Sequence, residues 1–207
     1  MKREGQIIII SAPSGAGKTT LCSGLLKRFP NIRESISYTT RPPRQGEIHG
    51  EDYFFVSKVE FQRMATEQRF AEWAEVHGNL YGTALKTLED ARNNGIDLVL
   101  DIDCQGARQL REKFSKGSYI FILPPSMAEL RRRLESRSSD TPEVIERRIK
   151  RAAEEIKEAC WYEYVIINDN LEKALEELTA IVISQNCRSL TMQEQITKLF
   201  DICCKVE

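Results

Sequence analysis

The chain has 207 residues, which is enough for one well-packed domain or for one core with a small inserted segment. Its hydrophobic content of 41%, charged content of 29% and formal net charge of -1 are those of a soluble globular protein, and they exclude a global basic field for nucleic acid. The six cysteines form no C-x-x-C pair, and the first apolar run is too short for a signal peptide. We therefore expect a cytoplasmic protein with free thiols.

The first predicted elements are a strand, a glycine-rich loop and a helix. Residues 7–10 are all isoleucine and predict a buried strand, and the helix places Leu21, Leu25 and Leu26 on one face. The loop between them reads Ser11-Ala12-Pro13-Ser14-Gly15-Ala16-Gly17-Lys18-Thr19-Thr20. A phosphate-binding P-loop requires this order, because the loop amides and the helix N-terminus then point at phosphate oxygens.

Individual residues of this loop have separate predicted roles. Gly15 and Gly17 let the backbone turn tightly. Lys18 would reach the β- and γ-phosphates of a nucleotide, and Thr19 would place its hydroxyl on Mg²⁺. Ala12 stands where the usual pattern has glycine, and a small residue there preserves the turn.

Residues 35–83 are predicted to form a small β-rich insert. The expected elements are strands over 35–40, 52–56 and 70–76, a helix that starts at the capping box Ser57-Lys58-Val59-Glu60, and a turn over 77–82. Phe61, Met64 and Ala65 would face inward from that helix. The insert interrupts an otherwise regular alternation of strands and helices.

A proline-stiffened turn inside the insert carries two arginines. Pro42 and Pro43 keep Arg41 and Arg44 out of a helix. Together with Tyr53 and Tyr81, these arginines form a candidate anion site, because a guanidinium binds phosphate through paired N–H groups and tyrosine hydroxyls add donors. The alternative is an ordinary pair of surface arginines.

Strands and helices alternate after the insert. The first expected elements are a helix from an N-cap at Thr83 to Gly95, a strand over 96–103, a helix over 105–114 and a strand over 119–123. Two helices follow, one with Met127, Leu130 and Leu134 and one that begins at Thr141-Pro142-Glu143 and buries residues as far as Cys160. The last expected elements are a strand over 164–167, a helix with Leu171 to Val182 and a helical tail over 190–207. The alternation predicts an α/β fold, in which helices cover both faces of a parallel sheet.

Two aspartates follow the apolar run 98–100. Asp101 matches the position that holds Mg²⁺ in P-loop proteins, and the alternative is that it caps the helix that follows. Asp103 lies two residues further on and would face the same side of the strand. Ligands bind at the carboxyl ends of parallel strands, so both carboxylates would lie near the P-loop.

Basic residues cluster on both sides of the polar segment 136–141. Such a segment suits a lid over a transferring phosphate, because phosphoryl transfer needs cations where the transition-state charge develops. The alternative is a solvated helix held by i,i+4 ion pairs such as Glu143–Arg147 and Arg151–Glu155.

Several motifs occur in a fixed order along the chain. They are Ser11 to Thr19, Thr39-Thr40-Arg41-Pro42-Pro43-Arg44-Gln45-Gly46-Glu47, Gly50-Glu51-Asp52-Tyr53-Phe54-Phe55-Val56, Gly78-Asn79-Leu80-Tyr81-Gly82-Thr83 and Leu100-Asp101-Ile102-Asp103-Cys104-Gln105-Gly106. Together they resemble the guanylate kinase family, over about residues 6–187. The resemblance implies transfer of the γ-phosphoryl group of ATP to GMP, and to dGMP, with Mg²⁺ as cofactor. The net charge of -1 and the lack of a stretch that approaches a membrane span predict no nucleic-acid or membrane partner.

The resemblance also implies a role for individual residues. The ATP site would comprise Ala12, Pro13, Ser14, Gly15, Ala16, Gly17, Lys18, Thr19, Thr20 and Asn168, and the GMP site Ser37, Arg41, Arg44, Tyr53, Glu72, Tyr81, Thr83 and Asp103. Thr19 and Asp101 would hold the metal, and Lys18, Arg41, Arg133, Arg137 and Arg148 would be catalytic. The P-loop core would span 1–34 and 84–207, with a lid over about 126–160, and the GMP-binding insert would span 35–83.

The chemistry of guanine agrees with these roles. Guanine presents N1–H and N2–H₂ as adjacent donors, and a carboxylate such as Glu72 accepts from both. Adenine lacks this pair, so a buried Glu72 would reject it. Two alternatives stay open, namely a guanylate-kinase-like binding domain without turnover and a P-loop kinase of another metabolite. Retention of Lys18 and Arg148 weighs against the first, and Glu72 weighs against the second.

Overall fold

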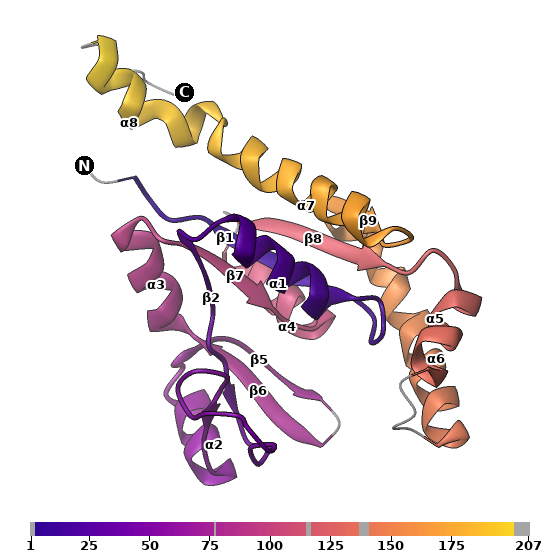
Figure 1. The fold of residues 1–207 in the computed structure, drawn as a ribbon. Coiled ribbons are helices and arrows are strands. Elements are labelled where there is room, and N and C mark those ends of the chain that lie inside the picture. The colour runs from indigo at the N-terminus through magenta and orange to yellow at the C-terminus, as the bar shows by residue number, and fades with distance from the viewer. Residues whose placement is uncertain (1–2, 77, 115–116, 137–140, 201–207) are drawn as a thin grey trace.

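The computed structural model describes residues 3–76, 78–114, 117–136 and 141–200, and its centre is a five-stranded parallel sheet (Figure 1). The strands are β1 (Ile7–Ser11), β2 (Ile32–Glu34), β7 (Asp97–Asp101), β8 (Ser118–Leu123) and β9 (Tyr164–Ile167), in the order β2-β7-β1-β8-β9. All neighbouring pairs in this sheet run parallel. The strand predicted over 164–167 is therefore confirmed, whereas β2 had no sequence-based prediction.

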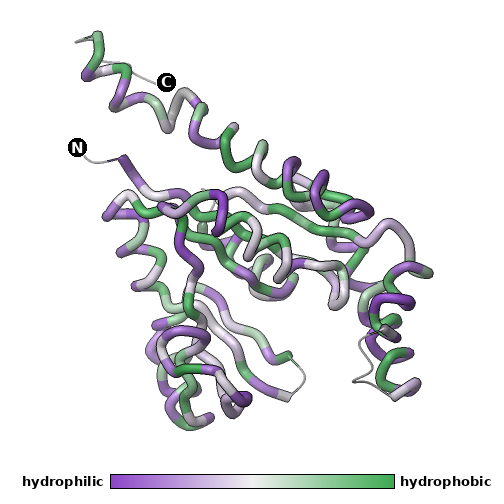
Figure 2. The backbone as a smooth tube through the Cα atoms, in the orientation of Figure 1, coloured by the Kyte–Doolittle hydropathy of each residue, from purple (hydrophilic) through white to green (hydrophobic). Residues whose placement is uncertain are grey.

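Helices cover both faces of this sheet, and successive residues of β1 contact opposite layers. Ile7 and Ile9 pack with α3 (Leu85–Asn94) and α4 (Cys104–Lys113), whereas Ile8 and Ile10 pack with α1 (Lys18–Arg28) and α7 (Leu171–Asn186). A strand buried on both faces is apolar at every position, which explains the run of isoleucines. The central strands are coloured mostly as hydrophobic in Figure 2. The predicted fold class is confirmed.

The insert contains a second, four-stranded sheet. Its strands are β3 (Tyr38–Thr39), β4 (Phe54–Phe55), β5 (Phe70–Val76) and β6 (Asn79–Ala84), in the order β4-β3-β6-β5. Helix α2 (Lys58–Thr66) packs Phe61 and Met64 against Phe70 and Leu80. Ser57 caps α2 by accepting a hydrogen bond from the Glu60 amide at 3.1 Å, as its capping box predicts.

Two predictions about the second half of the insert were wrong. Residues 79–82 were expected to be a turn, but they belong to β6, which pairs with β5 along its whole length. Thr83 was expected to cap α3, but the N-cap is Ala84. Thr83 lies inside β6, and its backbone N–H and its hydroxyl both donate to Glu72. Its side chain is therefore committed to the neighbouring strand.

The helices α5 (Met127–Glu135) and α6 (Pro142–Lys157) form a small separate layer with Leu130, Leu134 and Ile145 in its core. The predicted start of α6 at Thr141-Pro142 is confirmed. Cys160 was expected on the buried face of that helix, but α6 ends at Lys157 and a 3-10 turn, η1 (Glu158–Trp161), leaves Cys160 exposed.

The chain continues beyond α7 into α8 (Ser189–Phe200), so the helical tail is confirmed as far as residue 200. Figure 1 shows α8 extending past the end of the sheet. Cys203 and Cys204 lie outside the described residues, and Cys22, Cys104, Cys160 and Cys187 are free thiols. Within the described ranges, no helix combines the length and the apolar character needed to cross a membrane.

Candidate active site

The phosphate loop joins β1 to α1 and is held by two glycines and one asparagine. Gly15 and Gly17 both have φ of +97°, a left-handed conformation that favours glycine. The Asn168 Nδ2 donates to the Ala16 carbonyl oxygen at 2.7 Å, and a Cβ on Gly17 would lie 2.3 Å from that Nδ2. Ala12 does not have a positive φ, so this position accepts alanine in place of glycine.

Lys18 and Asp101 form an ion pair at the end of β7. Lys18 Nζ also donates to the Ile102 carbonyl oxygen at 3.1 Å. Burial opposes the charge on Lys18, but the carboxylate of Asp101 outweighs it, so the pKa of Lys18 is raised above its ordinary value. The structure thus brings the candidate phosphate-binding cation and the candidate metal ligand into direct contact.

Asp103, rather than Asp101, caps the following helix. Its Oδ1 accepts a hydrogen bond from the Gly106 amide at 2.9 Å. The strand ends at Asp101, two residues before the predicted end, because the chain turns there to enter α4. Asp103 therefore reaches the site from a helix cap, and the capping alternative for Asp101 is wrong.

A cavity of about 250 Å³ opens beside the phosphate loop. Its lining comprises Ala12, Pro13, Ser14, Gly15, Gly17, Lys18, Thr19, Thr20, Val76, Asp103, Arg148, Arg151 and Glu155. The loop, the β5–β6 hairpin, the α4 cap and α6 therefore converge on one space, although Figure 1 shows them as separate parts of the fold. Arg151 and Glu155 form the predicted i,i+4 ion pair, at 2.8 Å, and both line this cavity.

The arginines of the α5–α6 layer reach the phosphate loop and its neighbour β9. Arg148 donates to the Ser14 hydroxyl. Arg133 donates to the backbone carbonyl of Asn168 at 2.9 Å, while Glu129 accepts from its Nε at 2.8 Å. Arg137 lies outside the described residues. Arg133 and Arg148 are thus placed against the predicted ATP site from two different helices.

Glu72 is a buried carboxyl group on β5, with an exposed fraction of 3%. Its Oε1 accepts hydrogen bonds from both the amide and the hydroxyl of Thr83, at 2.9 and 2.6 Å. A Cβ on Gly106 would lie 2.2 Å from Oε2, so the second oxygen abuts the glycine of α4. Burial, followed by the nearby Asp103, raises the pKa of Glu72 to about 7, and the Thr83 hydrogen bonds limit the rise.

Three of the four residues of the predicted anion site, namely Arg41, Tyr53 and Tyr81, lie together in the insert. The guanidinium of Arg41 lies 5.4 Å from the centre of the Tyr53 ring, and the Tyr53 and Tyr81 rings meet edge to face at 6.0 Å. Both oxygens of Glu47 accept from Arg41, a contact that the sequence did not reveal. Burial raises the pKa of Tyr53, and the charges of Asp101 and Lys18 also act on it.

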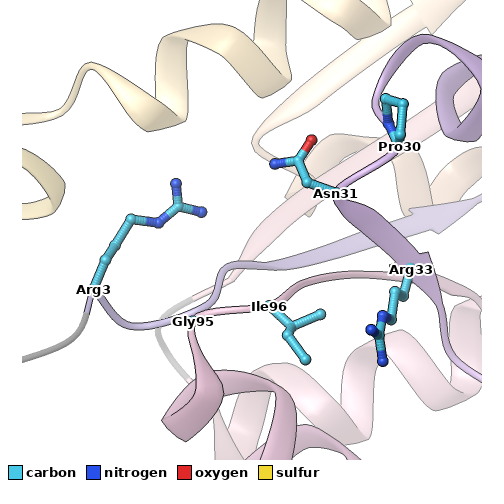
Figure 3. Close-up of a pocket in the computed structure, with 6 residues that line it drawn as sticks. All are labelled: Arg3, Pro30, Asn31, Arg33, Gly95 and Ile96. Atoms are coloured by element: carbon cyan, nitrogen blue, oxygen red, sulfur yellow. The ribbon is translucent and has the colours of Figure 1, made fainter.

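A larger cavity, of about 460 Å³, lies elsewhere and belongs to neither site (Figure 3). Its lining includes Asn31 and Ile96, which directly precede β2 and β7, and Arg33 of β2, so it lies near the amino ends of these strands. Arg3 lines it as well, but its guanidinium pairs with Asp97 and donates to the Asn186 side chain. The phosphate loop lies at the carboxyl ends, where ligands of parallel sheets bind.

Comparison with known proteins accounts for nearly the whole chain. The family model described as guanylate kinase matches residues 4–185. The guanylate kinases of Geobacter metallireducens and Geobacter sulfurreducens are each 59% identical over 202 residues, which is 98% of this chain and 100% of each relative. The chain belongs to the guanylate kinase family. Phosphoryl transfer to GMP, giving GDP, is the function of guanylate kinases.

A solved guanylate kinase structure has the same fold. The crystal structure of guanylate kinase from Anaplasma phagocytophilum matches with a TM-score of 0.77 and 36% identity, over 98% of each chain. The parallel sheet with helices on both faces is thus the architecture of a guanylate kinase.

Proposed function

We propose that this guanylate kinase transfers the γ-phosphoryl group of ATP to GMP or dGMP, giving ADP and GDP or dGDP, with the residues assigned below. The observation that carries the choice of acceptor is the buried carboxyl group of Glu72, one oxygen of which is occupied by Thr83. In its ionised form this group only accepts hydrogen bonds, which suits the paired donors of guanine, and adenine would leave its second oxygen without a partner.

On the ATP side, the loop residues 12–20 bind the phosphates and Asn168 lies beside the adenine. The left-handed glycines and the Asn168–Ala16 hydrogen bond support this assignment, because they fix the backbone that presents its N–H groups. Lys18 contacts the β- and γ-phosphates. Arg133, Arg137 and Arg148 supply positive charge to the transferring group.

Thr19 and Asp101 are the proposed ligands of Mg²⁺. Both present oxygen atoms, which this cation prefers, and Asp101 adjoins the lysine that would share the phosphates. When bound, Mg²⁺ supplies charge neutralisation to the phosphate oxygens.

On the GMP side, Arg41, Arg44, Tyr53 and Tyr81 bind the phosphate, while the base-binding residues are Ser37, Glu72, Thr83 and Asp103. The cluster of Arg41 with the two tyrosine rings supports the phosphate assignment. A general base is unnecessary, because the GMP phosphate has a second pKa of about 6 and is largely a dianion at neutral pH. Positioning and charge neutralisation account for the catalysis.

Residues 35–83 serve as the GMP-binding insert of a core formed by 1–34 and 84–207, and residues of about 126–160 serve as a lid. The insert has its own sheet and the α5–α6 layer has its own core, which supports movement of each as a unit. Scattering should show compaction when both nucleotides are bound, and an unchanged radius would contradict closure. We place the protein in the cytoplasm, with nucleotides rather than nucleic acid or membranes as its partners.

The direct test is coupled ADP production with ATP, Mg²⁺ and each nucleoside monophosphate in turn. Turnover with GMP and dGMP alone is expected, and turnover with a different monophosphate instead would overturn the base assignment. Lys18→Met should abolish turnover while GMP still binds in calorimetry. Retained turnover in that variant would refute the role given to the phosphate loop.

A further inference from the structure

Glu47 accepts three hydrogen bonds within the turn between β3 and β4. Arg41 Nη1 donates to Glu47 Oε2 at 2.9 Å, and Arg41 Nη2 donates to Oε1 at 2.8 Å. The backbone N–H of Arg44 donates to the same Oε2 at 2.6 Å. The side chains of Arg41 and Glu47 are only 12% and 17% exposed. A single carboxylate thus connects the side chain of one phosphate-binding arginine to the backbone of the other.

Glu47 and Pro42 do not use one edge of the Arg41 guanidinium, and the Tyr81 hydroxyl, itself assigned to the phosphate site, also hydrogen-bonds to this side chain. Nη1 donates one hydrogen bond to Glu47 and the other to the carbonyl oxygen of Pro42, the latter at 2.9 Å. Nε–H and the second hydrogen of Nη2 lie side by side on a different edge, which is the geometry that binds two oxygens of one phosphate. The rings of Tyr53 and Phe55, at 5.4 and 5.8 Å from the guanidinium, restrict its rotation.

On the basis of the function proposed above, we propose that Glu47 is a positioning residue for the GMP phosphate. It holds Arg41 so that the Nε–Nη2 edge faces the phosphate, and it ties the Arg44 backbone into the same turn. In this arrangement Glu47 acts through the arginines and does not itself contact the nucleotide.

The charge of Glu47 matters as well as its shape. The hydrogen bond from Arg41, followed by that from the Arg44 amide, lowers the pKa of Glu47 to about 2, so the carboxylate stays ionised at neutral pH. A competitor for the phosphate would have to occupy the edge that the phosphate uses. Glu47 instead uses the end of the guanidinium already shared with Pro42, which favours positioning over competition.

The test is Glu47→Gln, in which the side-chain shape stays but an amide N–H₂ faces the arginine donors. Loss of the fixed guanidinium should raise the KM for GMP by about tenfold. The KM for ATP should change little. Guanosine has the base but no phosphate, so its affinity in calorimetry should match that of the wild type. Glu47→Asp keeps the charge and should restore part of the loss.

Glu51→Gln is the matched control, because Glu51 is an exposed acid in the same segment. An unchanged KM for GMP in Glu47→Gln would overturn the proposal, and tighter GMP binding would show that Glu47 competes with the phosphate. Equal losses for GMP and guanosine would show a collapsed turn, which also overturns it. The affinities of GMP and guanosine, both measured by calorimetry, need no turnover, so a failure of this proposal is distinguishable from a failure of the wild-type enzyme to phosphorylate GMP.

Discussion

Replacement of Glu72 by glutamine tests guanine recognition with the smallest change in shape. In the wild type, the amide and the hydroxyl of Thr83 both donate to Oε1. The glutamine oxygen must therefore stay at the Oε1 position to satisfy those donors, which forces its N–H₂ group to the Oε2 position. Guanine N1–H and N2–H₂ would then meet a donor in place of an acceptor.

The expected loss follows from the hydrogen bonds that disappear. Charge-assisted hydrogen bonds to a buried carboxylate contribute about 2–4 kcal/mol to the bound state, so kcat/KM for GMP should fall roughly 30- to 900-fold. The protein itself should fold normally, because the Thr83 contacts survive and a neutral amide replaces a buried acid.

The assay is coupled ADP production at about pH 8, with GMP and AMP as separate acceptors. Glu75→Gln is the control, since Glu75 is an exposed acid on the same strand. The ratio of kcat/KM for GMP to that for AMP should fall in Glu72→Gln and stay constant in the control. An unchanged ratio in Glu72→Gln, with the protein folded, would refute the argument that this carboxyl group reads guanine.

Four further predictions concern Glu72, its neighbour Gly106 and the phosphate loop. The pKa of Glu72 is raised to about 7, so the KM for GMP should rise as the pH falls from about 8 to about 6, whereas Glu72→Gln should show only the slope of the GMP phosphate. Folding raises the pKa of Glu72, so the protonated side chain contributes about 3 kcal/mol to the free energy of unfolding below about pH 4.5. This contribution is lost as the pH rises through about 7. Urea titrations at several pH values would reveal the loss. Gly106→Ala places a methyl group 2.2 Å from the position of Glu72 Oε2 in the wild type. We therefore expect weaker GMP binding in calorimetry and a loss of about 1–3 kcal/mol in the free energy of unfolding in urea titrations. Wild-type values in both measurements would contradict this prediction. Asn168→Ala leaves the buried Ala16 carbonyl without its donor, so the KM for ATP should rise several-fold in steady-state assays while the KM for GMP changes less; equal changes in both would count against a local effect on the phosphate loop.

Local signals in the sequence predict the parts of the site that lie on one segment. The isoleucine run, the left-handed glycines and the lysine that starts α1 are neighbours in the chain, so the phosphate loop is readable from residue order alone. The capping box at Ser57 is equally local and was confirmed. In these cases the interacting groups are only a few residues apart.

Contacts between distant segments could not be predicted in the same way. The hydrogen bond between Thr83 and Glu72 depends on the register of the β5–β6 hairpin. The sequence did not predict this hairpin, because residues 77–82 were assigned to a turn. The division of roles between Asp101 and Asp103 depends on where β7 ends, which no residue between them signals. The Arg41–Glu47 pair spans a turn whose shape is set by the β3 and β4 strands around it.

The hydrogen bonds between the N-terminal segment and the end of α7 suggest where the chain could be circularly permuted. Gln6 Nε2 and Arg3 Nη1 both donate to the Asn186 side-chain oxygen at 3.1 Å, so these distant positions are neighbours in space. A short linker could join them and new termini could open at an exposed loop, such as the one after α2, without cutting a strand of the main sheet. The cavity beside the phosphate loop lies at the opposite edge of that sheet, away from the new join.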